Sequence, residues 1–161
     1  MKSNKSIGKT AAACIAAATA LLLSACCVYH VSSTSITYTN GSSHNIEFSL
    51  TTTDDSGAFI RTTDIALKPT ESYTFGNNTK GGGYISPHTI TGDCRTVVFD
   101  NETAVNHYGP NRDETDGIKE HSICDDESYE CDASDRHDYN RRYTYTFTDE
   151  DYDRATAANA E

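Results

Sequence analysis

Two segments of the chain alternate strictly between apolar and polar residues, and this period of two limits the possible folds more than any other feature. Successive side chains of a β-strand point to opposite faces of its sheet, so such segments are typical of half-buried strands. We therefore expect strands over residues 46–50 and 142–147. Their apolar residues are Ile46, Phe48, Leu50, Tyr143, Tyr145 and Phe147.

The rest of the chain contains shorter segments with the same alternation. Asn40-Gly41 and Asp100-Asn101 fall between such segments, and both pairs tolerate the positive φ of tight hairpin turns. Many short strands at intervals of about 8 to 12 residues are typical of a two-sheet antiparallel sandwich or a small barrel. The further strands that we expect are 35–39, 58–62, 65–68, 72–75, 84–90, 95–100 and 103–108.

One short helix is expected within residues 148–158. Thr148 can cap the amides that follow it, and Asp151 occupies the acidic position of a capping box. Asp149 and Glu150 suit the positive end of a helix dipole. The sequence therefore predicts an all-β fold, an antiparallel β-sandwich that ends in a short helix.

The first 25 residues have the layout of a secretory signal. Lys2, Lys5 and Lys9 precede an uncharged run of about sixteen residues, 10–25, that is rich in alanine and leucine. A membrane span needs ~20 residues, so this run is short for one. We expect residues 1–25 to be a signal peptide that is removed. The alternatives to a lipid-anchoring signal are an ordinary signal peptide and a buried helix whose last residues happen to be cysteine.

The end of this run, Leu23-Ser24-Ala25-Cys26, resembles the lipobox of bacterial lipoproteins. In that motif small residues before the cysteine permit cleavage, and a diacylglycerol is then attached to the thiol. The resemblance implies that Cys26 is the lipid anchor and that the membrane is a partner of the protein. Cys27 fits less well, because Cys26 would stand before it in place of a small residue. Two or three acyl chains hold a protein stably to a bilayer.

The remaining 136 of the 161 residues have the length of one domain. We expect a tether over residues 26–34 and a single β-sandwich domain over 35–161. Removing the three leader lysines takes the formal net charge from −11 to −14. Phosphate backbones repel such an acidic chain, and no basic stripe is interleaved with aromatic residues, so we expect no nucleic-acid partner.

The segment 109–140, an insert in the expected domain, is the most acidic part of the chain. It holds eleven acidic residues against three basic ones and has few large apolar side chains. Such a segment buries too little apolar surface to offset the entropy cost of ordering, so it needs a cross-link to become ordered. In an oxidising compartment we expect that cross-link to be a disulfide between Cys124 and Cys131. Four cysteines besides the anchor allow three connectivities, so the partners of Cys27 and Cys94 stay open.

Two metal hypotheses concern the same segment. A cluster of aspartates offers hard oxygen ligands for calcium, although it lacks the glycine and the spacing of a calcium-binding hand, and a solvated acidic loop is the commoner explanation. His121, Cys124, Cys131 and His137 superficially resemble a zinc set, but the two cysteines are too widely spaced and a disulfide would remove both thiolates. We expect no cofactor. The candidate calcium ligands are Asp125, Asp126, Asp132, Asp135 and Asp138.

The chain carries none of the sequence signatures of the common hydrolases. There is no G-x-S-x-G elbow, no H-E-x-x-H and no thiol-protease signature, so we expect no enzyme and no catalytic residues. A structural, adhesive or interaction role with a protein or glycan partner is the expected function. The alternative is a glycan- or calcium-binding module that uses the loops 77–83 and 109–140.

Four segments carry a resemblance to a known family: 23–26, 65–71, 96–100 and 143–152. Through them the layout of the chain resembles the small lipoproteins of unknown function found in Bacteroidota, in which a lipobox and a short tether precede a compact β-sandwich. The resemblance implies an Ig-like domain anchored to the outer membrane, with no established activity. Acidic residues often follow the anchor in surface-exported members, whereas Cys27-Val28-Tyr29-His30 has none, so the periplasmic and the surface face both stay open.

Overall fold

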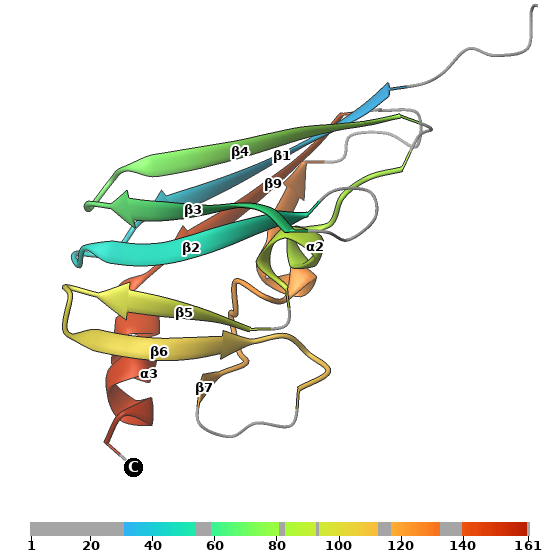
Figure 1. Cartoon of the computed structure of the whole chain (residues 1–161). Helices are drawn as coiled ribbons and strands as arrows, with labels where there is room; N and C mark the ends of the chain where they lie inside the picture. The colour runs from blue at the N-terminus through green and yellow to red at the C-terminus, as the bar shows by residue number, and fades with distance from the viewer. Residues whose placement is uncertain are drawn as a thin grey trace, which may run out of the picture. The chain divides into compact units, whose positions relative to one another are not determined.

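The structure, a computed structural model, describes residues 31–53, 59–80, 83–92, 94–112, 117–132 and 140–160. These residues form an all-β sandwich of two sheets, which confirms the predicted fold class (Figure 1). One sheet has the strand order β4-β1-β9-β8 and the other has the order β3-β2-β5-β6-β7. The strands are β1 (Val31–Asn40), β2 (Ile46–Thr53), β3 (Phe59–Leu67), β4 (Ser72–Lys80), β5 (Cys94–Phe99), β6 (Thr103–Tyr108), β7 (Gly117–Ile118), β8 (Glu130–Asp132) and β9 (Asn140–Phe147). The helical elements are α2 (Pro87–Thr91), the 3-10 turn η1 (Asp126–Ser128) and α3 (Asp149–Ala158).

Strand β1 lies inside the four-stranded sheet, between β4 and β9. It runs antiparallel to β4, with Ile36 opposite Phe75, and parallel to β9, with Ile36 beside Tyr143. The first strand of the domain is therefore a neighbour of the last one. Short strand β8 pairs antiparallel with the other side of β9 and forms one edge of the sheet.

The five-stranded sheet is built mainly from two hairpins. Strands β2 and β3 pair with Phe48 opposite Ile65, and β5 and β6 pair with Val97 opposite Val105. The β5–β6 turn contains Asp100 and Asn101 at φ 51° and 59°, which confirms the predicted hairpin turn. Strand β7 adds to β6 in the parallel direction.

The Asn40-Gly41 pair does not form the predicted hairpin turn. It lies in the connection between β1 and β2, which belong to different sheets. The buried side chain of Asn40 donates to the carbonyl oxygens of His44 at 2.7 Å and Leu67 at 3.0 Å. A Cβ on Gly41 would lie 3.1 Å from the carbonyl oxygen of Phe147. Close packing at the crossing between the sheets, not a tight hairpin, therefore accounts for these two residues.

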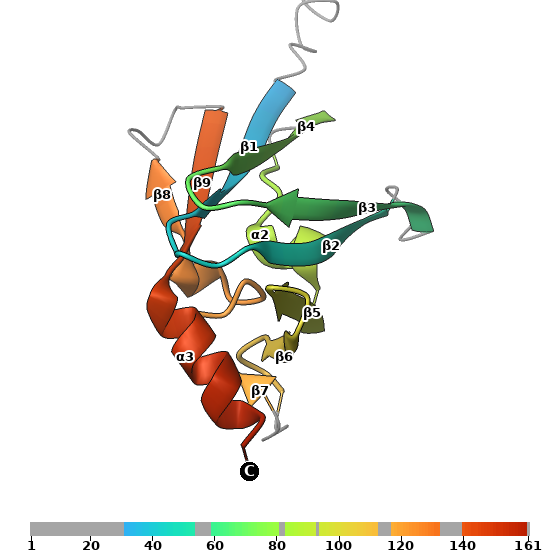
Figure 2. The ribbon, with the colours of Figure 1, turned by 90° about the vertical axis from the view of Figure 1, so that its left-hand side faces the viewer.

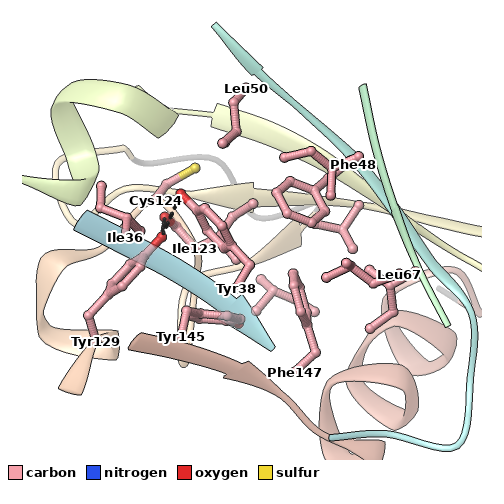
Figure 3. Packing of buried hydrophobic residues seen from close by; sticks show 14 of the residues in the cluster. Ile36, Tyr38, Phe48, Leu50, Leu67, Ile123, Cys124, Tyr129, Tyr145 and Phe147 are labelled. Atoms are coloured by element: carbon pink, nitrogen blue, oxygen red, sulfur yellow. Dashed lines mark hydrogen bonds between the residues drawn. The ribbon is translucent and has the colours of Figure 1, made fainter. Parts of the chain in front are cut away.

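Aromatic side chains fill the space between the two sheets (Figure 3). The rings of Tyr38 and Phe48 lie 5.0 Å apart, and those of Tyr145 and Phe147 lie 4.8 Å apart. Burying a tyrosine requires a partner for its hydroxyl group. The hydroxyl of Tyr145 donates to the carbonyl oxygen of His121 at 2.6 Å, and that of Tyr129 donates to Ile123 at 2.7 Å. Both acceptors come from the acidic segment.

The described strands are longer than the apolar pattern predicts. Strand β1 begins at Val31, so the last four residues of the expected tether 26–34 belong to the sheet, and Ser32 and Thr34 are buried. Strand β4 continues to Lys80, through most of the expected loop 77–83. These extensions consist mostly of small polar residues, such as Ser32, Ser33, Asn77 and Asn78. Backbone pairing with neighbouring strands holds them, and hydropathy alone does not predict them.

The strand predicted over residues 84–90 is wrong, because this segment contains the short helix α2. Pro87 stands at the start of the helix, where its missing N–H costs nothing and its fixed φ already fits the helical turn. Ile90 and Thr91 on the same helix are buried. The apolar residues here follow a helical turn and not an alternation.

The acidic segment 109–140 is part of the domain core over its described residues. Ile118, Ile123, Cys124 and Tyr129 are all buried in the main hydrophobic cluster. Packing of these four side chains holds the described part of the segment against the core. The low apolar content of the whole insert therefore did not predict that these residues are buried.

The C-terminal helix is present as predicted. Helix α3 runs from Asp149 to Ala158, and the side chain of Asp151 accepts a hydrogen bond from the backbone N–H of Thr148 at 2.8 Å. The helix lies alongside β6 and β7 (Figure 2). No helix within the described ranges is both long and apolar enough to cross a membrane.

Candidate functional site

Two histidine–aspartate pairs flank the first turns of α3. Nδ1 of His121 lies 2.8 Å from Oδ1 of Asp151, and Nδ1 of His44 lies 2.6 Å from Oδ2 of Asp100. Such pairs occur both in catalytic sites and in structural networks, so the surroundings of each pair decide between the two roles.

The His121–Asp151 pair lies at the junction of the acidic segment and α3. His121 has φ 51°, an uncommon conformation for a non-glycine residue, and its ring stacks on Tyr145 with the centroids 4.7 Å apart. Asp151 is fully buried and also accepts from the backbone N–H of Thr148 and from Arg154, the latter at 3.1 Å. Every hydrogen bond of this carboxylate fixes the helix or the loop beside it.

The charge of Asp151 is stabilised where it is buried. Burial alone would raise the pKa of this carboxyl group. Hydrogen bonds from His121 and from the Thr148 N–H outweigh burial and hold the pKa below its ordinary value. Asp151 is therefore an anion at neutral pH, which is the form that can bind His121 and Arg154 together.

His107 on β6 is a third histidine close to this pair. Its side chain is fully buried, and its Nδ1 lies 3.4 Å from the backbone nitrogen of Ile123. Its Nε2 has no hydrogen-bond partner among the described residues. Burial lowers the pKa of His107 to about 4, although the charge of Asp151 acts in the opposite direction. His107 is therefore neutral at physiological pH.

A surface hollow of about 450 Å³ lies beside this network. Its walls bring together the apolar surface of Ile118 and Ala157 with charged groups of both signs, Lys119, Glu120 and Arg154. Because Arg154 also binds Asp151, the hollow and the buried network share one side chain. A hollow that is open to solvent and lined by both apolar and charged side chains can bind a group on the surface of a partner.

The His44–Asp100 pair is more exposed. The ring of His44 stacks on Tyr152 of α3, with the centroids 3.6 Å apart. Asp100 also accepts from the backbone N–H of Asn45 at 2.8 Å. The hydrogen bond from His44, followed by that from Asn45, lowers the pKa of Asp100. This pair connects the β1–β2 and β5–β6 turns and places His44 against the helix.

The predicted site residues are dispersed in the structure. The structure shows no disulfide among its described cysteines, the expected Cys124–Cys131 pair included; Cys124 is buried in the core, and Cys131 is exposed on β8. In the register of the four-stranded sheet, Cys131 lies opposite Tyr143. The predicted anchor, Cys26, lies outside the described residues.

The structure does not bring the predicted calcium ligands together over the residues that it describes. Asp125 caps η1 by accepting from the backbone N–H of Glu127, and Asp126 accepts from the N–H of His88 at 2.7 Å. Asp132 is exposed on β8. Within the described ranges, no three histidine, cysteine or acidic side chains are grouped closely enough to hold a metal ion. Asp135 and Asp138, together with His137 of the zinc hypothesis, lie outside these ranges.

The two histidine–aspartate pairs were not predicted from the sequence. The capping pattern identifies Asp151 as a helix-capping residue, but its second partner, His121, is 30 residues away. Asp100 was predicted only as a turn residue, and its partner His44 is 56 residues away. No local pattern connects residues at such separations.

The chain matches no protein-family model, and neither the curated proteins nor the solved structures contain a significant match to it. The functional argument therefore depends on the sequence and on the geometry described above.

Proposed function

We propose that this protein is a lipid-anchored, non-catalytic lipoprotein of the cell envelope, whose β-sandwich presents one rigid end to a protein or glycan partner. The lipid would be attached to Cys26 after removal of residues 1–25. The histidine–aspartate pairs would hold α3 and the neighbouring turns in place and would perform no chemistry.

The small number of residues between the predicted anchor and the first strand is the observation that carries this proposal. Strand β1 begins at Val31, only five residues after Cys26. Five residues of extended chain span at most ~18 Å. A lipid on Cys26 would therefore hold the domain directly against the membrane, with the Val31 end of β1 facing the bilayer.

The opposite end of β1 would then face away from the membrane. It adjoins four connections, which we call the turn end and define as residues 40–45, 68–71, 100–102 and 148–149. A strand of ten residues is ~30 Å long, so the turn end lies about that far from Val31. A partner in the aqueous phase could then reach it.

Hydrogen bonds between different connections make the turn end rigid. The N–H of Thr70 donates to the carbonyl oxygen of Asn40 at 2.8 Å, and the N–H of Ser43 donates to the carboxylate of Asp149 at 2.8 Å. The Asn45–Asp100 hydrogen bond described above links two more connections. A surface ordered before binding loses little entropy when a partner docks, which favours an interaction role.

Fatty-acid labelling of intact cells tests the anchor. Cells that express the tagged full-length protein would be fed a clickable palmitate analogue, and the protein would be isolated and examined for label. We expect label on the unaltered protein and on the Cys27→Ser variant but none on the Cys26→Ser variant. Equal labelling of all three, or label lost only with Cys27→Ser, would contradict Cys26 as the anchor.

Site-specific photocrosslinking tests the presentation of the turn end. A photoreactive amino acid would replace the exposed Glu102 in the turn end or, as a control, the exposed Asn78 towards the Val31 end of the sheet. We expect an envelope component to be crosslinked from position 102 and not from position 78. Crosslinking from position 78 alone would exclude the proposed orientation.

A further inference from the structure

We propose that the Val31 end of the four-stranded sheet is a membrane-contact surface, whose arginine side chains bind the phosphate groups of anionic lipid headgroups. The inference rests on the proposed function, because a lipid on Cys26 would bring this end of the domain to the bilayer. It goes beyond the anchor by assigning a second contact with the membrane to the folded domain itself.

Basic residues gather where β1 begins. Lys80 lies opposite Val31 in the register, and Arg141 and Arg142 lie beside the fourth and fifth residues of β1 (Figure 1). The first five residues of β1, the last five of β4 and the first four of β9 include no acidic residue. The register places one acidic residue of β8, Asp132, opposite Arg142. Basic residues therefore prevail at these strand ends, although the formal net charge of the chain is −11.

Two tyrosines hold the side chain of Arg141. Its guanidinium carbon lies 3.9 Å from the ring centroid of Tyr84, and its Nη1 donates to the hydroxyl of Tyr143 at 3.4 Å. Neither partner is a carboxylate, so these contacts orient the guanidinium group without neutralising its charge. Arg142, the next residue, is exposed. Guanidinium groups bind phosphate oxygens through two parallel hydrogen bonds, so this pair suits a phosphate better than a point charge would.

Residues 84 and 85 add apolar surface beside the two arginines. The N–H of Ile85 donates to Oγ1 of Thr34 at 3.3 Å, which places this segment against the start of β1. The side chains of Tyr84 and Ile85 are only partly buried. Tyrosine rings are typical of the membrane–water interface, where the ring meets apolar groups and the hydroxyl meets water. Basic and amphipathic side chains together are thus suited to the headgroup layer of a bilayer.

The charge at the turn end has the opposite sign. Its exposed acidic residues include Glu71, Glu102 and Asp149, and its one lysine is Lys68. An anionic membrane attracts basic groups within about a Debye length and repels acidic ones. Electrostatic attraction and the lipid anchor therefore favour the same orientation, with the Val31 end on the membrane and the turn end away from it.

A single tryptophan can report this contact, because the chain contains none. Tyr84→Trp places the probe under the guanidinium group of Arg141, and Tyr152→Trp places a control probe on α3. Each full-length protein would be produced in cells, isolated in detergent and reconstituted into vesicles whose acyl chains carry bromine, which quenches tryptophan fluorescence. One set of vesicles contains phosphatidylcholine alone, and the other also contains phosphatidylglycerol.

We expect phosphatidylglycerol to increase the quenching of the Tyr84→Trp protein and high salt to remove the increase, because salt screens the attraction. The Tyr152→Trp protein should show no such increase. This comparison needs no change to the arginines, so it holds even if an arginine variant folds poorly.

Removing the arginines from the Tyr84→Trp protein tests their role. One basic side chain near an anionic surface strengthens binding about five-fold, so Arg142→Gln should lower the ratio of docked to undocked protein by about that factor. Arg141→Gln and Arg142→Gln together should lower it roughly 25-fold. Lys68→Gln with Lys119→Gln is the matched control, because both lysines are exposed and the pair removes the same charge. This control should keep the quenching of the parent protein.

Equal quenching of the Tyr84→Trp protein in both sets of vesicles, or equal losses from the arginine and the lysine substitutions, would overturn the inference. Palmitate labelling of the same preparations reports the anchor separately. Label on the protein without lipid-dependent quenching would overturn the membrane contact and keep the anchor. Lipid-dependent quenching without label would uphold the contact and contradict the anchor, and the absence of both would overturn both.

Discussion

The imidazole of His121 and the buried carboxylate of Asp151 lie 2.8 Å apart, and this contact joins the acidic segment to the C-terminal helix. Its two members come from parts of the chain that the sequence pattern assigns to a solvated insert and to a helix cap. In the structure both belong to one network with Tyr145 and Arg154. The acidic segment is therefore held by specific polar contacts as well as by its apolar residues.

Replacing Asp151 by alanine is expected to lower the free energy of unfolding by about 3 kcal/mol. The change removes a helix cap and leaves His121 and Arg154 without their shared anion. Urea denaturation of both proteins at pH 7 measures the difference. Asp153→Ala is the matched control on the same helix, because Asp153 is exposed. Equal effects of the two substitutions would show that the buried network contributes nothing.

Stability is expected to fall as the pH is lowered from about 6.5 to about 4, because of His107. Its pKa of about 4 in the folded protein lies below the ordinary value of 6.5. Between these values the unfolded chain binds a proton that the folded chain does not, so acid favours unfolding. The contribution at pH 5 is about 2 kcal/mol relative to pH 7.

Urea denaturation at pH 7, 6 and 5 checks this dependence. In His107→Gln the difference between pH 7 and pH 5 should shrink by about 2 kcal/mol. His88→Gln is the control, since His88 is only partly buried, and it should keep the dependence of the unaltered protein. An unchanged slope in His107→Gln would show that His107 is not the titrating group. Asp151 acts in the same direction but at lower pH, because its pKa lies below the ordinary carboxyl value.

Substituting Gly117 by alanine is expected to cost about 2 kcal/mol and to detach β7 from β6. A Cβ at this position would lie 2.3 Å from the carbonyl oxygen of Asn106 and 2.6 Å from the ring of Tyr108. Gly76 on β4 has open space at its Cβ position, so Gly76→Ala should change Tm little. Thermal unfolding followed by circular dichroism compares the two variants. A Gly117→Ala protein as stable as Gly76→Ala would contradict the described packing of β7.

Removing the hydroxyl of Tyr145 is expected to cost about 1.5 kcal/mol. The Tyr145→Phe variant keeps the buried ring but leaves the carbonyl oxygen of His121 without the donor that lies 2.6 Å away. Tyr152→Phe keeps the stacking on His44 and should cost less, because Tyr152 is only partly buried. Chemical denaturation measures both. A smaller loss for Tyr145 than for Tyr152 would contradict a structural role for this hydroxyl.

The sequence predicted the features that depend on neighbouring residues. The alternation around Phe48 and Tyr145 lies within β2 and β9, the capping pattern of Thr148 marks the start of α3, and the Asp100-Asn101 turn joins β5 to β6. Each of these follows from the chemistry of a few adjacent positions.

The features that the sequence did not reveal depend on partners far along the chain. Ser32 and Thr34 are buried because β4 and β9 lie on either side of β1, and no hydropathy pattern marks a buried serine. Likewise, the pairing of His121 with Asp151 arises only after the sandwich has formed. The polar residues of the candidate site were therefore harder to predict than the strands that carry them.

The parallel pairing of β1 with β9 also determines when the domain can fold during synthesis. Ser33 lies beside Asn140, so the first described strand needs a neighbour that is made 107 residues later. Contacts this distant in sequence form slowly, because a long loop must close first. The four-stranded sheet therefore stays incomplete until β9 has been made, so most of the domain must wait, unfolded at this sheet, for its last strand.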